Sequence, residues 1–359
     1  MQLKVKGLLL AGGWGTRLRP LTYTGNKHML PIANQPMIMY GLNHLIQAGV
    51  REIAIILGPM KEGIVEYLGD GSKLGAKLTY IEQEEPKGLS HAVLCAKDYL
   101  KDSPFVMYLG DNLLKQGAKP FLESYATGKW DCIIGVTKVK DPSRYGVVEM
   151  DGNKIKTFKE KPKEPKSNLA LIGVYVFNNK IFDSISRIKP SKRGELEITD
   201  AIQDLLDSGA RIKIENVNGW WKDTGKPDDL LEANQLVLSD IEGSSQGLIE
   251  DGVQQTGKMS IGKGTIIRAN ASLRGPVKIG NNCEIGPGVY VGPYTSIGDN
   301  SKILSGEIEN SLIMNNVTIR TEKRIVDSII GNNTTIIDTK AVLPKATKLI
   351  VGENTFVAI

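Results

Sequence analysis

Residues 8–32 read "LLLAGGWGTRLRPLTYTGNKHMLPI" and begin with an apolar run that stops at Gly12 and Gly13. A compact apolar run closed by glycines predicts a buried strand followed by a tight turn. Glycines after a strand let several backbone N–H groups converge on one point, where they can bind an anion. Arg17 and Lys27 follow and add positive charge. The stretch therefore predicts a strand of an α/β fold that ends in a turn suited to binding an anion.

The glycine-rich turn matches neither of two familiar phosphate motifs. The pattern G-x-x-x-x-G-K-[ST] is absent, and only Gly13 and Gly15 fit the pattern G-x-G-x-x-G. Glycines after a strand also serve as purely structural turns in α/β folds. From this stretch alone, phosphate binding and a structural turn both stay open.

Strand and helix signals alternate from this stretch to about residue 240. Apolar runs predict buried strands, and apolar residues at helical spacing predict helices, the third of them capped by Ser90. Such alternation predicts an α/β sandwich around a mostly parallel sheet over residues 1–241. The expected strands are 5–11, 52–57, 78–82, 105–109, 132–139, 171–177 and 211–217, and the expected helices are 36–48, 61–68, 90–100, 197–207 and 227–240.

The pattern changes after residue 241. Residues 242–257 are polar and rich in glycine, which predicts a connector. In residues 258–359 a six-residue period fits one short strand and a turn per segment, coiled into a solenoid with one apolar residue pointing inward. Ordinary hairpins, the alternative, would show a period of two and turn dipeptides. The residues that carry the six-residue period are Ile261, Ile267, Leu273, Ile279, Ile285, Val291, Ile297 and Ile303.

Composition narrows the possible classes of protein. The 359 residues carry a net charge of +5 and no basic stripe with interleaved aromatics, so nucleic acid is not an expected partner. Cys95, Cys132 and Cys283 lie far apart, which argues against disulfides and a zinc site. No apolar stretch approaches 18 residues, and the first apolar run is too short for a signal peptide. We therefore expect a cytoplasmic protein that does not enter a membrane.

Longer motifs extend the signal of the opening stretch. These motifs are "GGWGTRLRPLT", "NKHMLPI", "LGDGSKLG" (68–75), "LGDN" (109–112), "RYGVVE" (144–149), "EKP" (160–162), "RGELEITD" (193–200) and "WKDTG" (221–225). With them, the chain resembles the sugar-1-phosphate nucleotidylyltransferases over about residues 3–240, most closely the long glucose-1-phosphate thymidylyltransferases with a C-terminal β-helix.

The resemblance implies both a fold and a reaction. The fold is a Rossmann-like nucleotidyltransferase sandwich with a mostly parallel sheet, followed over residues 258–359 by a left-handed parallel β-helix of hexapeptide repeats. The hand of the helix comes from the resemblance alone. The reaction is Mg²⁺-dependent transfer of a nucleotidyl group from dTTP or UTP to glucose 1-phosphate, with release of pyrophosphate.

The implied reaction needs positive charge and positioning more than acid–base groups. A sugar phosphate is already mostly ionised near neutral pH, because its second pKa is about 6. Charge must instead be neutralised where two anions meet. The resemblance implies that Arg17 grips the triphosphate and that Lys27 stabilises charge on the α-phosphate.

The resemblance also implies residues for each ligand. Asp111 and Asp223 would hold Mg²⁺, which prefers a few carboxylates with phosphate oxygens and water. Gln83 and Gly88 would meet a pyrimidine base. The implied nucleotide-binding residues are Leu10, Ala11, Gly12, Gly13, Gly15, Thr16, Gln83, Gly88 and Asp111, and the implied sugar-phosphate residues are Tyr145, Gly146, Glu160, Lys161 and Gly173.

Some positions depart from the family's usual pattern. Trp14 stands where a small residue or lysine is common, and aromatic residues there are familiar in guanylyltransferase relatives. Asn26 and His28 flank Lys27 where serine and glutamine are usual in the thymidylyl enzymes. Guanylyl or uridylyl transfer to another sugar 1-phosphate is therefore the alternative reaction.

A non-catalytic regulatory or scaffold subunit of the same architecture is the alternative class of function. The full set of charged residues favours the enzyme. All three histidines precede the repeat region, so an acetyltransferase activity that uses a histidine there is not expected. We expect the repeat region to serve assembly or regulation, and we expect a homo-oligomer, because exposed strand edges favour packing between subunits.

Overall fold

The computed structural model describes residues 4–101 and 103–338 and divides into two compact units. The first unit draws on Met1–Trp14, Gly25–Met29 and Met37–Asp223, and the second on Gly15–Thr24, Leu30–Pro36 and Thr224–Ile359. The second unit takes in the chain from Thr224 onward, whereas the sequence predicts that the α/β domain ends at residue 241. Two segments of the opening stretch also belong to the second unit.

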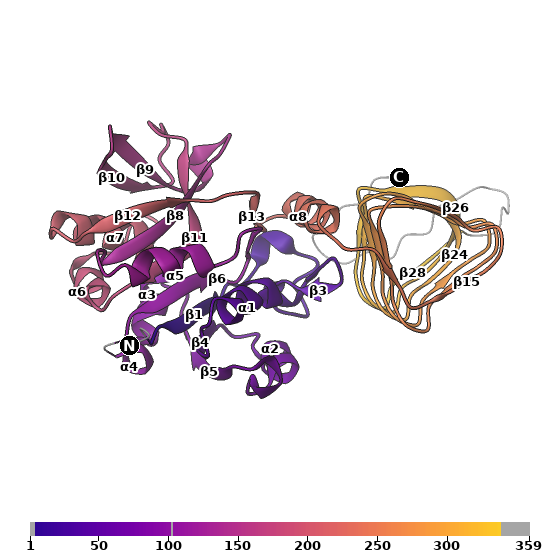
Figure 1. Ribbon diagram of the computed structural model, residues 1–359, viewed down its shortest axis with the longest axis horizontal. Coiled ribbons are helices and arrows are strands. Elements are labelled where there is room, and N and C mark those ends of the chain that lie inside the picture. The colour runs from indigo at the N-terminus through magenta and orange to yellow at the C-terminus, as the bar shows by residue number, and fades with distance from the viewer. Residues whose placement is uncertain (1–3, 102, 339–359) are drawn as a thin grey trace. The chain divides into compact units, whose positions relative to one another are not determined.

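A nine-stranded sheet forms the centre of the first unit (Figure 1). Strands β1 (Lys6–Ala11), β4 (Glu52–Leu57), β5 (Lys77–Glu82) and β6 (Phe105–Leu109) are parallel neighbours in the order β5-β4-β1-β6. β11 (Leu169–Phe177) pairs antiparallel with β6 and with β8 (Cys132–Lys138), and β12 (Ile212–Asn216) pairs parallel with β8. The mostly parallel sheet is confirmed. The antiparallel pair β9 (Gly146–Asp151) and β10 (Lys154–Glu160) was not expected.

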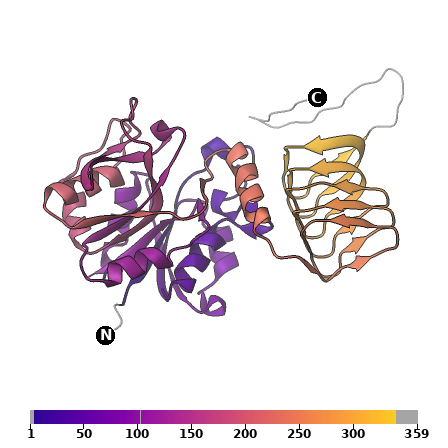
Figure 2. The ribbon, with the colours of Figure 1, turned by 45° about the horizontal axis from the view of Figure 1, so that its top comes forward.

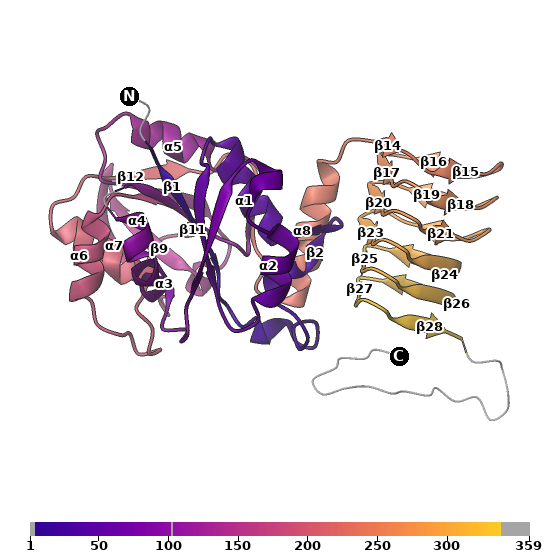
Figure 3. The same cartoon turned by 90° about the horizontal axis from the view of Figure 1, so that it is seen from below.

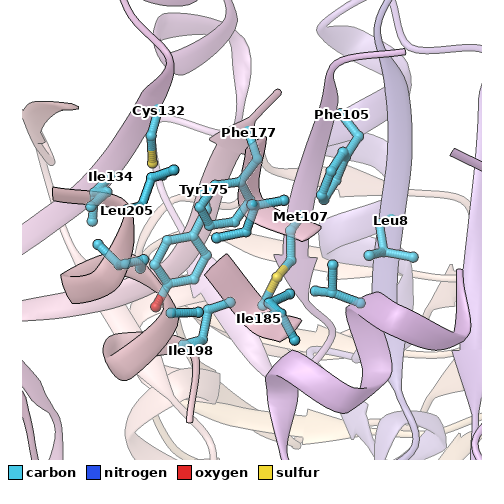
Figure 4. Close-up of a cluster of buried hydrophobic side chains, with 14 of the residues drawn as sticks. Leu8, Phe105, Met107, Cys132, Ile134, Tyr175, Phe177, Ile185, Ile198 and Leu205 are labelled. Carbon is cyan, nitrogen blue, oxygen red and sulfur yellow. The ribbon is translucent and has the colours of Figure 1, made fainter. Parts of the chain in front are cut away.

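Two hydrophobic cores cover opposite faces of this sheet. Along β1, Leu8 and Leu10 belong to one core and Leu9 and Ala11 to the other, as the alternation of side chains in a strand requires. Figure 4 shows the first core, in which Phe105, Tyr175 and Phe177 pack together. It takes in α3 (Leu89–Cys95), α4 (Lys97–Leu100), α6 (Lys180–Arg187) and α7 (Ile198–Asp207), and the second core takes in α1 (Ile38–Gln47), α2 (Glu62–Leu68) and α5 (Lys119–Ala126).

The predicted cap of the third helix is wrong. Residues 90–100 form two short helices, α3 and α4, and the residue before α3 is Gly88. The Ser90 hydroxyl lies inside α3 and donates to the carbonyl of Glu197 over 3.0 Å. The hydroxyl therefore joins α3 to the start of α7 instead of capping the N-terminus of a helix.

The second unit contains stacked parallel strands, seen end-on in Figure 1 and from other sides in Figures 2 and 3. Met259 pairs with Val277, which pairs with Thr295, so neighbouring strands are three six-residue segments apart. The eight apolar residues that predicted the repeat are all buried in one core. The strands are β14 (Ser244–Ser245), β15 (Leu248–Ile249), β16 (Gln254–Thr256), β17 (Met259–Ile261), β18 (Ile266–Ile267), β19 (Ser272–Arg274), β20 (Val277–Ile279), β21 (Glu284–Ile285), β22 (Tyr290–Val291), β23 (Thr295–Ile297), β24 (Lys302–Glu309), β25 (Leu312–Ile313), β26 (Thr318–Val326), β27 (Ile329–Ile330) and β28 (Thr335–Ile337).

The expected connector is part of this stack. Strands β14, β15 and β16 lie within residues 242–257 and pair in parallel with β17, β18 and β19. These residues therefore begin the parallel-strand region rather than lead to it. The last part of the expected repeat region, residues 339–359, lies outside the described residues.

A buried asparagine joins three parts of the second unit. Asn234 lies on α8 (Pro227–Ser239), and its Oδ1 accepts the backbone N–H of Ala33 over 2.8 Å and the hydroxyl of Ser296 over 3.0 Å. Its Nδ2 donates to the carbonyl of Tyr294 over 3.0 Å. The side chain thus ties α8 to the hairpin of β2 (Pro31–Ile32) and β3 (Gln35–Pro36) and to the parallel strands. Among the described residues, no helix has the length and apolarity that crossing a membrane requires.

An ionised carboxylate stabilises the first unit away from the glycine-rich turn. Asp131, which is 5% exposed, accepts from Asn178 and Lys180 at one oxygen and from Arg211 at the other. Burial is the largest influence and opposes its charge, but the contacts with Arg211 and Lys180 outweigh it and lower the pKa of Asp131. The stabilisation is therefore complete above the unfolded pKa of about 3.9 and is lost as pH falls below it.

We predict that Asp131→Asn lowers the free energy of unfolding at pH 7 by about 2–3 kcal/mol, because hydrogen bonds to a charged group are lost. The difference from wild type should be smaller at pH 3 than at pH 5, and it should disappear only as pH falls through the lowered folded pKa. Urea unfolding at pH 7, 5 and 3 measures it, with the exposed Asp98→Asn as control. An unchanged difference at pH 3 would contradict the assigned role.

Candidate active site

Two strand ends meet near the middle of the sheet. The chain runs from β1 through β4 to β5 on one side and then returns to β6 on the other side of β1. Ligands of open α/β sheets bind outside the carboxyl ends of the strands where the order reverses in this way. Leu10 and Ala11 end β1, and the backbone N–H of Gly110 donates to the carbonyl of Leu10 over 2.9 Å. The glycine-rich turn and Asp111 therefore leave the sheet side by side.

The glycines of the turn leave room for two polar side chains. A Cβ atom on Gly13 would lie 3.1 Å from Cε and 3.3 Å from Nζ of Lys27. A Cβ atom on Gly12 would lie 3.2 Å from Oε1 of Gln83. These close approaches bring four of the predicted residues together at the end of β1.

Lys27 forms an ion pair with Asp111 beside this turn. The two side chains are 12% and 17% exposed, so water screens their charges poorly. Burial is the largest influence and opposes the charge of Asp111, but Lys27, His28 and Asn112 outweigh it and hold the pKa of Asp111 well below its usual range. An ammonium group and an ionised carboxylate thus stand together at the carboxyl edge of the sheet.

Asn112 connects this ion pair to the neighbouring elements. Its Nδ2 donates to Oδ1 of Asp111 over 2.9 Å, and its Oδ1 accepts from the backbone N–H of Gly173 over 3.3 Å and from the indole of Trp221 over 2.7 Å. The sequence motifs contain Asn112 and Trp221, but no role was predicted for either. The only signal was their place inside "LGDN" and "WKDTG".

Asp223 lies next to the same group. β13 (Trp221–Asp223) pairs antiparallel with β7 (Asn112–Leu114), and the register sets Asp223 opposite Asn112. Asp111 immediately precedes β7 and Asp223 ends β13, so the pairing of these strands brings together two parts of the chain that are far apart in the sequence. Across residues 4–101 and 103–338, no three His, Cys, Asp or Glu side chains gather to hold a metal. Two carboxylates fit Mg²⁺ when phosphate oxygens and water complete its shell.

The Gln83 side chain is buried with its amide group oriented by its neighbours. Nε2 donates to the carbonyl of Gly88 over 3.1 Å and lies 3.0 Å from Nδ1 of His91. Because an amide nitrogen only donates, Nδ1 of His91 accepts. Gly88 has φ 99°, and a Cβ there would lie 2.6 Å from the carbonyl oxygen of Leu196, so glycine is required. Gln83 and Gly88 are therefore neighbours, and His91 contacts Gln83 beside them.

Glu160 lies at the end of the β9–β10 hairpin, where it pairs with Gly146. Its Oε2 accepts the hydroxyl of Thr199 over 3.1 Å, and its Oε1 lies 3.5 Å from Arg193. A Cβ atom on Gly146 would lie 3.1 Å from Oε2 of Glu160 and 2.6 Å from Cγ2 of Thr199. Thr199 and Arg193 belong to the "RGELEITD" motif, but no role was predicted for them.

Lys161 follows Glu160 in an uncommon backbone conformation, with φ 39°. Its backbone N–H donates to the carbonyl of Tyr145 over 3.0 Å, and its side chain is 43% exposed. The ring of Tyr145 meets Trp221 edge-on, with 5.3 Å between ring centroids. A Cβ atom on Gly173 would lie 2.7 Å from the side chain of Leu109. Trp221 therefore links the predicted sugar-phosphate residues to Asn112 and the two carboxylates.

Gly15, Thr16 and Arg17 belong to the second unit. Gly15 has φ 62° and precedes a short 3₁₀ helix, η1 (Thr16–Leu18). The guanidinium group of Arg17 lies against Gly225, 3.2 Å from the position a Cβ would take there. The first unit thus gathers Lys27, Asp111, Asp223 and the predicted base and sugar residues.

Comparison with known proteins gives matches over both parts of the chain. A family model described as nucleotidyl transferase matches residues 6–240, and one described as the GMPPB C-terminal domain matches residues 273–358. The low-salt glycan biosynthesis nucleotidyltransferase of Haloferax volcanii is 47% identical over 98% of this chain and 99% of its own length. A glucose-1-phosphate thymidylyltransferase of Streptomyces antibioticus is 41% identical over 99% of each chain.

Solved structures match about two thirds of the chain. The structure of a UDP-glucose pyrophosphorylase complexed with UDP-glucose has a TM-score of 0.60 and 29% identity, and the match covers 67% of this chain and 100% of that one. The matched part of this chain shares the fold of that structure.

Proposed function

Since the chain belongs to the nucleotidyl transferase family, we propose that it transfers a thymidylyl or uridylyl group to glucose 1-phosphate. Transfer of a nucleotidyl group to a sugar 1-phosphate is the activity that the relatives share. The choice of nucleotide and of glucose is our proposal. It rests on thymidylyltransferase relatives and on a similar structure that holds UDP-glucose.

The ion pair of Lys27 with Asp111 at the end of β1 and β6 is the observation that carries this proposal. A buried lysine beside a glycine-rich turn is suited to a triphosphate, because charge is stabilised most where water is excluded. The pair also keeps the ammonium and the carboxylate ready for two different ligands. Lys27 turns to the α-phosphate, and Asp111 turns to a cation.

The proposed step joins two anions. A phosphate oxygen of the sugar 1-phosphate forms a bond to the α-phosphorus, and the bond from that phosphorus to the bridging oxygen breaks. The electron pair of that bond leaves with pyrophosphate. No general base is needed, because the attacking phosphate is already ionised near neutral pH. Lys27 neutralises the charge that collects on the α-phosphate, and Arg17 binds the leaving pyrophosphate.

Mg²⁺ is the proposed cofactor, and Asp111 and Asp223 would hold it. When bound, it would neutralise the triphosphate and align its oxygens. The remaining chain groups orient the two substrates. Gln83 offers donor and acceptor groups to the imide edge of a pyrimidine, Glu160 accepts from sugar hydroxyls, and Lys161 binds the sugar phosphate.

We also propose a role for the second unit. The eighteen-residue step between paired strands supports a parallel β-helix, and its left hand follows from the family resemblance. We propose that this β-helix packs between subunits of a homo-oligomer. Acetyl transfer is not proposed for it, because all three histidines of the chain lie before residue 92.

Pyrophosphate release tests the reaction. The chain is incubated with glucose 1-phosphate and Mg²⁺, and dTTP, UTP, GTP, CTP and ATP are compared at equal concentration. We predict release with dTTP and UTP that differs by at most about a hundredfold, since a single methyl group contributes about 1–3 kcal/mol to selection. No release with any nucleotide and any sugar 1-phosphate would overturn the proposal and favour a scaffold subunit.

Guanylyl transfer is a second candidate, and Trp14 favours it. The side chain is 45% exposed and borders a small pocket together with Gly12, Gly13, Asn26 and Met60. An exposed indole at the rim of the turn offers a flat surface on which a purine could stack. Release with GTP alone would select this candidate over the pyrimidine nucleotides.

A further inference from the structure

Asn26 and His28, the residues on either side of Lys27, are both buried. Asn26 is 6% exposed and His28 is 1% exposed. Neither is part of the step described above, and the family pattern suggests serine and glutamine in their place. A polar side chain that is buried must be hydrogen-bonded to be tolerated.

The side chain of Asn26 makes four hydrogen bonds. Its Nδ2 donates to the carbonyl of Ala11 over 3.4 Å and to the carbonyl of Met60 over 3.1 Å. Its Oδ1 accepts the backbone N–H of His28 over 2.9 Å and contacts the ring Nδ1 of His28 at 2.7 Å. Both halves of the amide are therefore in use.

These contacts fix the orientation of the amide and the tautomer of the imidazole. Rotating the amide by 180° would place NH₂ against the N–H of His28 and oxygen against two carbonyls, so the assigned orientation is the one that satisfies every group. Because Oδ1 only accepts, Nδ1 of His28 must carry the hydrogen. Burial, followed by the charge of Lys27, lowers the pKa of His28 to about 3, which agrees with a neutral ring.

The same contacts attach the Lys27 segment to three parts of the first unit. Ala11 is the last residue of β1, and Met60 follows β4. The ring of His28 lies against Gly110, where a Cβ would be 3.0 Å from Cδ2. The backbone on both sides of Lys27 is thereby held to the ends of the central strands.

We propose that Asn26 and His28 are positioning residues that hold the backbone of Lys27 fixed through the hydrogen bond from Nδ1 of His28 to Asn26. With the backbone fixed, the ammonium group alone moves from Asp111 to the α-phosphate. This inference rests on the proposed function. Precise placement matters because a misplacement of about 1 Å can cost a hundredfold in rate.

Two replacements of His28 distinguish the role of Nδ1 from the role of Nε2. Asparagine places an amide nitrogen near the position of Nδ1, and glutamine places it near the position of Nε2. We predict that His28→Asn retains kcat within about fivefold of wild type, whereas His28→Gln lowers it by about thirtyfold or more. The KM values for nucleotide and sugar phosphate should change by less than about threefold in both.

His44→Gln is the matched control. His44 is a half-buried histidine, and its Nδ1 lies 3.1 Å from the hydroxyl of Tyr108 on β6. This variant should lower thermal stability but leave kcat within about twofold. Equal losses of kcat in His28→Asn and His28→Gln, or wild-type kcat in His28→Gln, would overturn the proposal.

A double variant tests whether the two residues act as one unit. Asn26→Ala and Asn26→Ala/His28→Gln are compared with His28→Gln. If one hydrogen bond carries the effect, the double variant loses no more kcat than the more damaged single variant. Losses that multiply would contradict a shared role.

Nuclear magnetic resonance tests the hydrogen bond from Nδ1 of His28 to Asn26 without a measurement of enzyme activity. In protein labelled with ¹⁵N-histidine, we expect a proton bonded to Nδ1 of His28 and an unprotonated Nε2 near neutral pH. This result stands even if no nucleotide supports turnover, so failure of the proposed function is separable. A proton on Nε2 instead would overturn the inference.

Discussion

Lys27→Met is expected to lower kcat by about 10²–10³, because removing one preorganised donor from a transition state costs about 2.7–4 kcal/mol. Methionine keeps the length of the side chain, so the space beside Gly13 stays filled. KM for the nucleotide should rise less than kcat falls, because charge on the α-phosphate grows during the reaction. Steady-state pyrophosphate release measures both constants.

Two further variants serve as controls for Lys27→Met. Lys119→Met removes an exposed lysine whose partner is Glu123 on the same helix, and it should leave kcat within about twofold. Lys27→Arg keeps the charge with a different shape, and it should recover only part of the lost rate. A kcat for Lys27→Met within tenfold of wild type would remove Lys27 from the proposed step.

The repeat region was predictable because its signal is local. Each six-residue segment repeats one apolar position, and Ile261, Ile279 and Ile297 come to lie above one another in neighbouring strands. The first coil lacked that signal, because residues 244–245 and 254–256 are exposed and carry no apolar pattern. They were therefore expected to be a connector, although backbone pairing makes them strands.

The candidate site was predictable where a motif carries it. In the structure Gln83 lies beside Gly88, Asp223 lies opposite Asn112, which follows Asp111, and Glu160 pairs with Gly146. The residues that sequence reasoning missed act between segments. Asn112 bonds Trp221 and Gly173, and His91 bonds Gln83, contacts that depend on which donor faces which acceptor in the folded chain. Spacing along the sequence holds no information about such pairings.

Asp223→Asn is expected to raise the Mg²⁺ concentration needed for half-maximal activity at least tenfold and to lower kcat by about 10²–10⁴. A carboxamide keeps the shape of the side chain but removes the charge that a hard cation prefers, and a bound metal contributes several kcal/mol to stabilising charge in the transition state. Activity against Mg²⁺ concentration measures both effects. Mn²⁺ binding in the presence of nucleotide, followed by electron paramagnetic resonance, measures affinity directly.

Comparison with Asp111→Asn separates two effects of one carboxylate. Asp111 is paired with Lys27, so its replacement removes a proposed metal ligand and also leaves a poorly exposed ammonium without its partner. Leaving one member of a buried pair uncompensated costs about 3–5 kcal/mol, so Asp111→Asn should lower thermal stability as well as Mg²⁺ affinity.

Asp223→Asn leaves the ion pair of Lys27 with Asp111 in place and should reduce Mg²⁺ affinity with a smaller change in melting temperature. The exposed Asp228→Asn on α8 is the control for both. Wild-type Mg²⁺ dependence in both variants would show that the cation binds elsewhere, because neither the Asp111 nor the Asp223 carboxylate would then be needed to hold it.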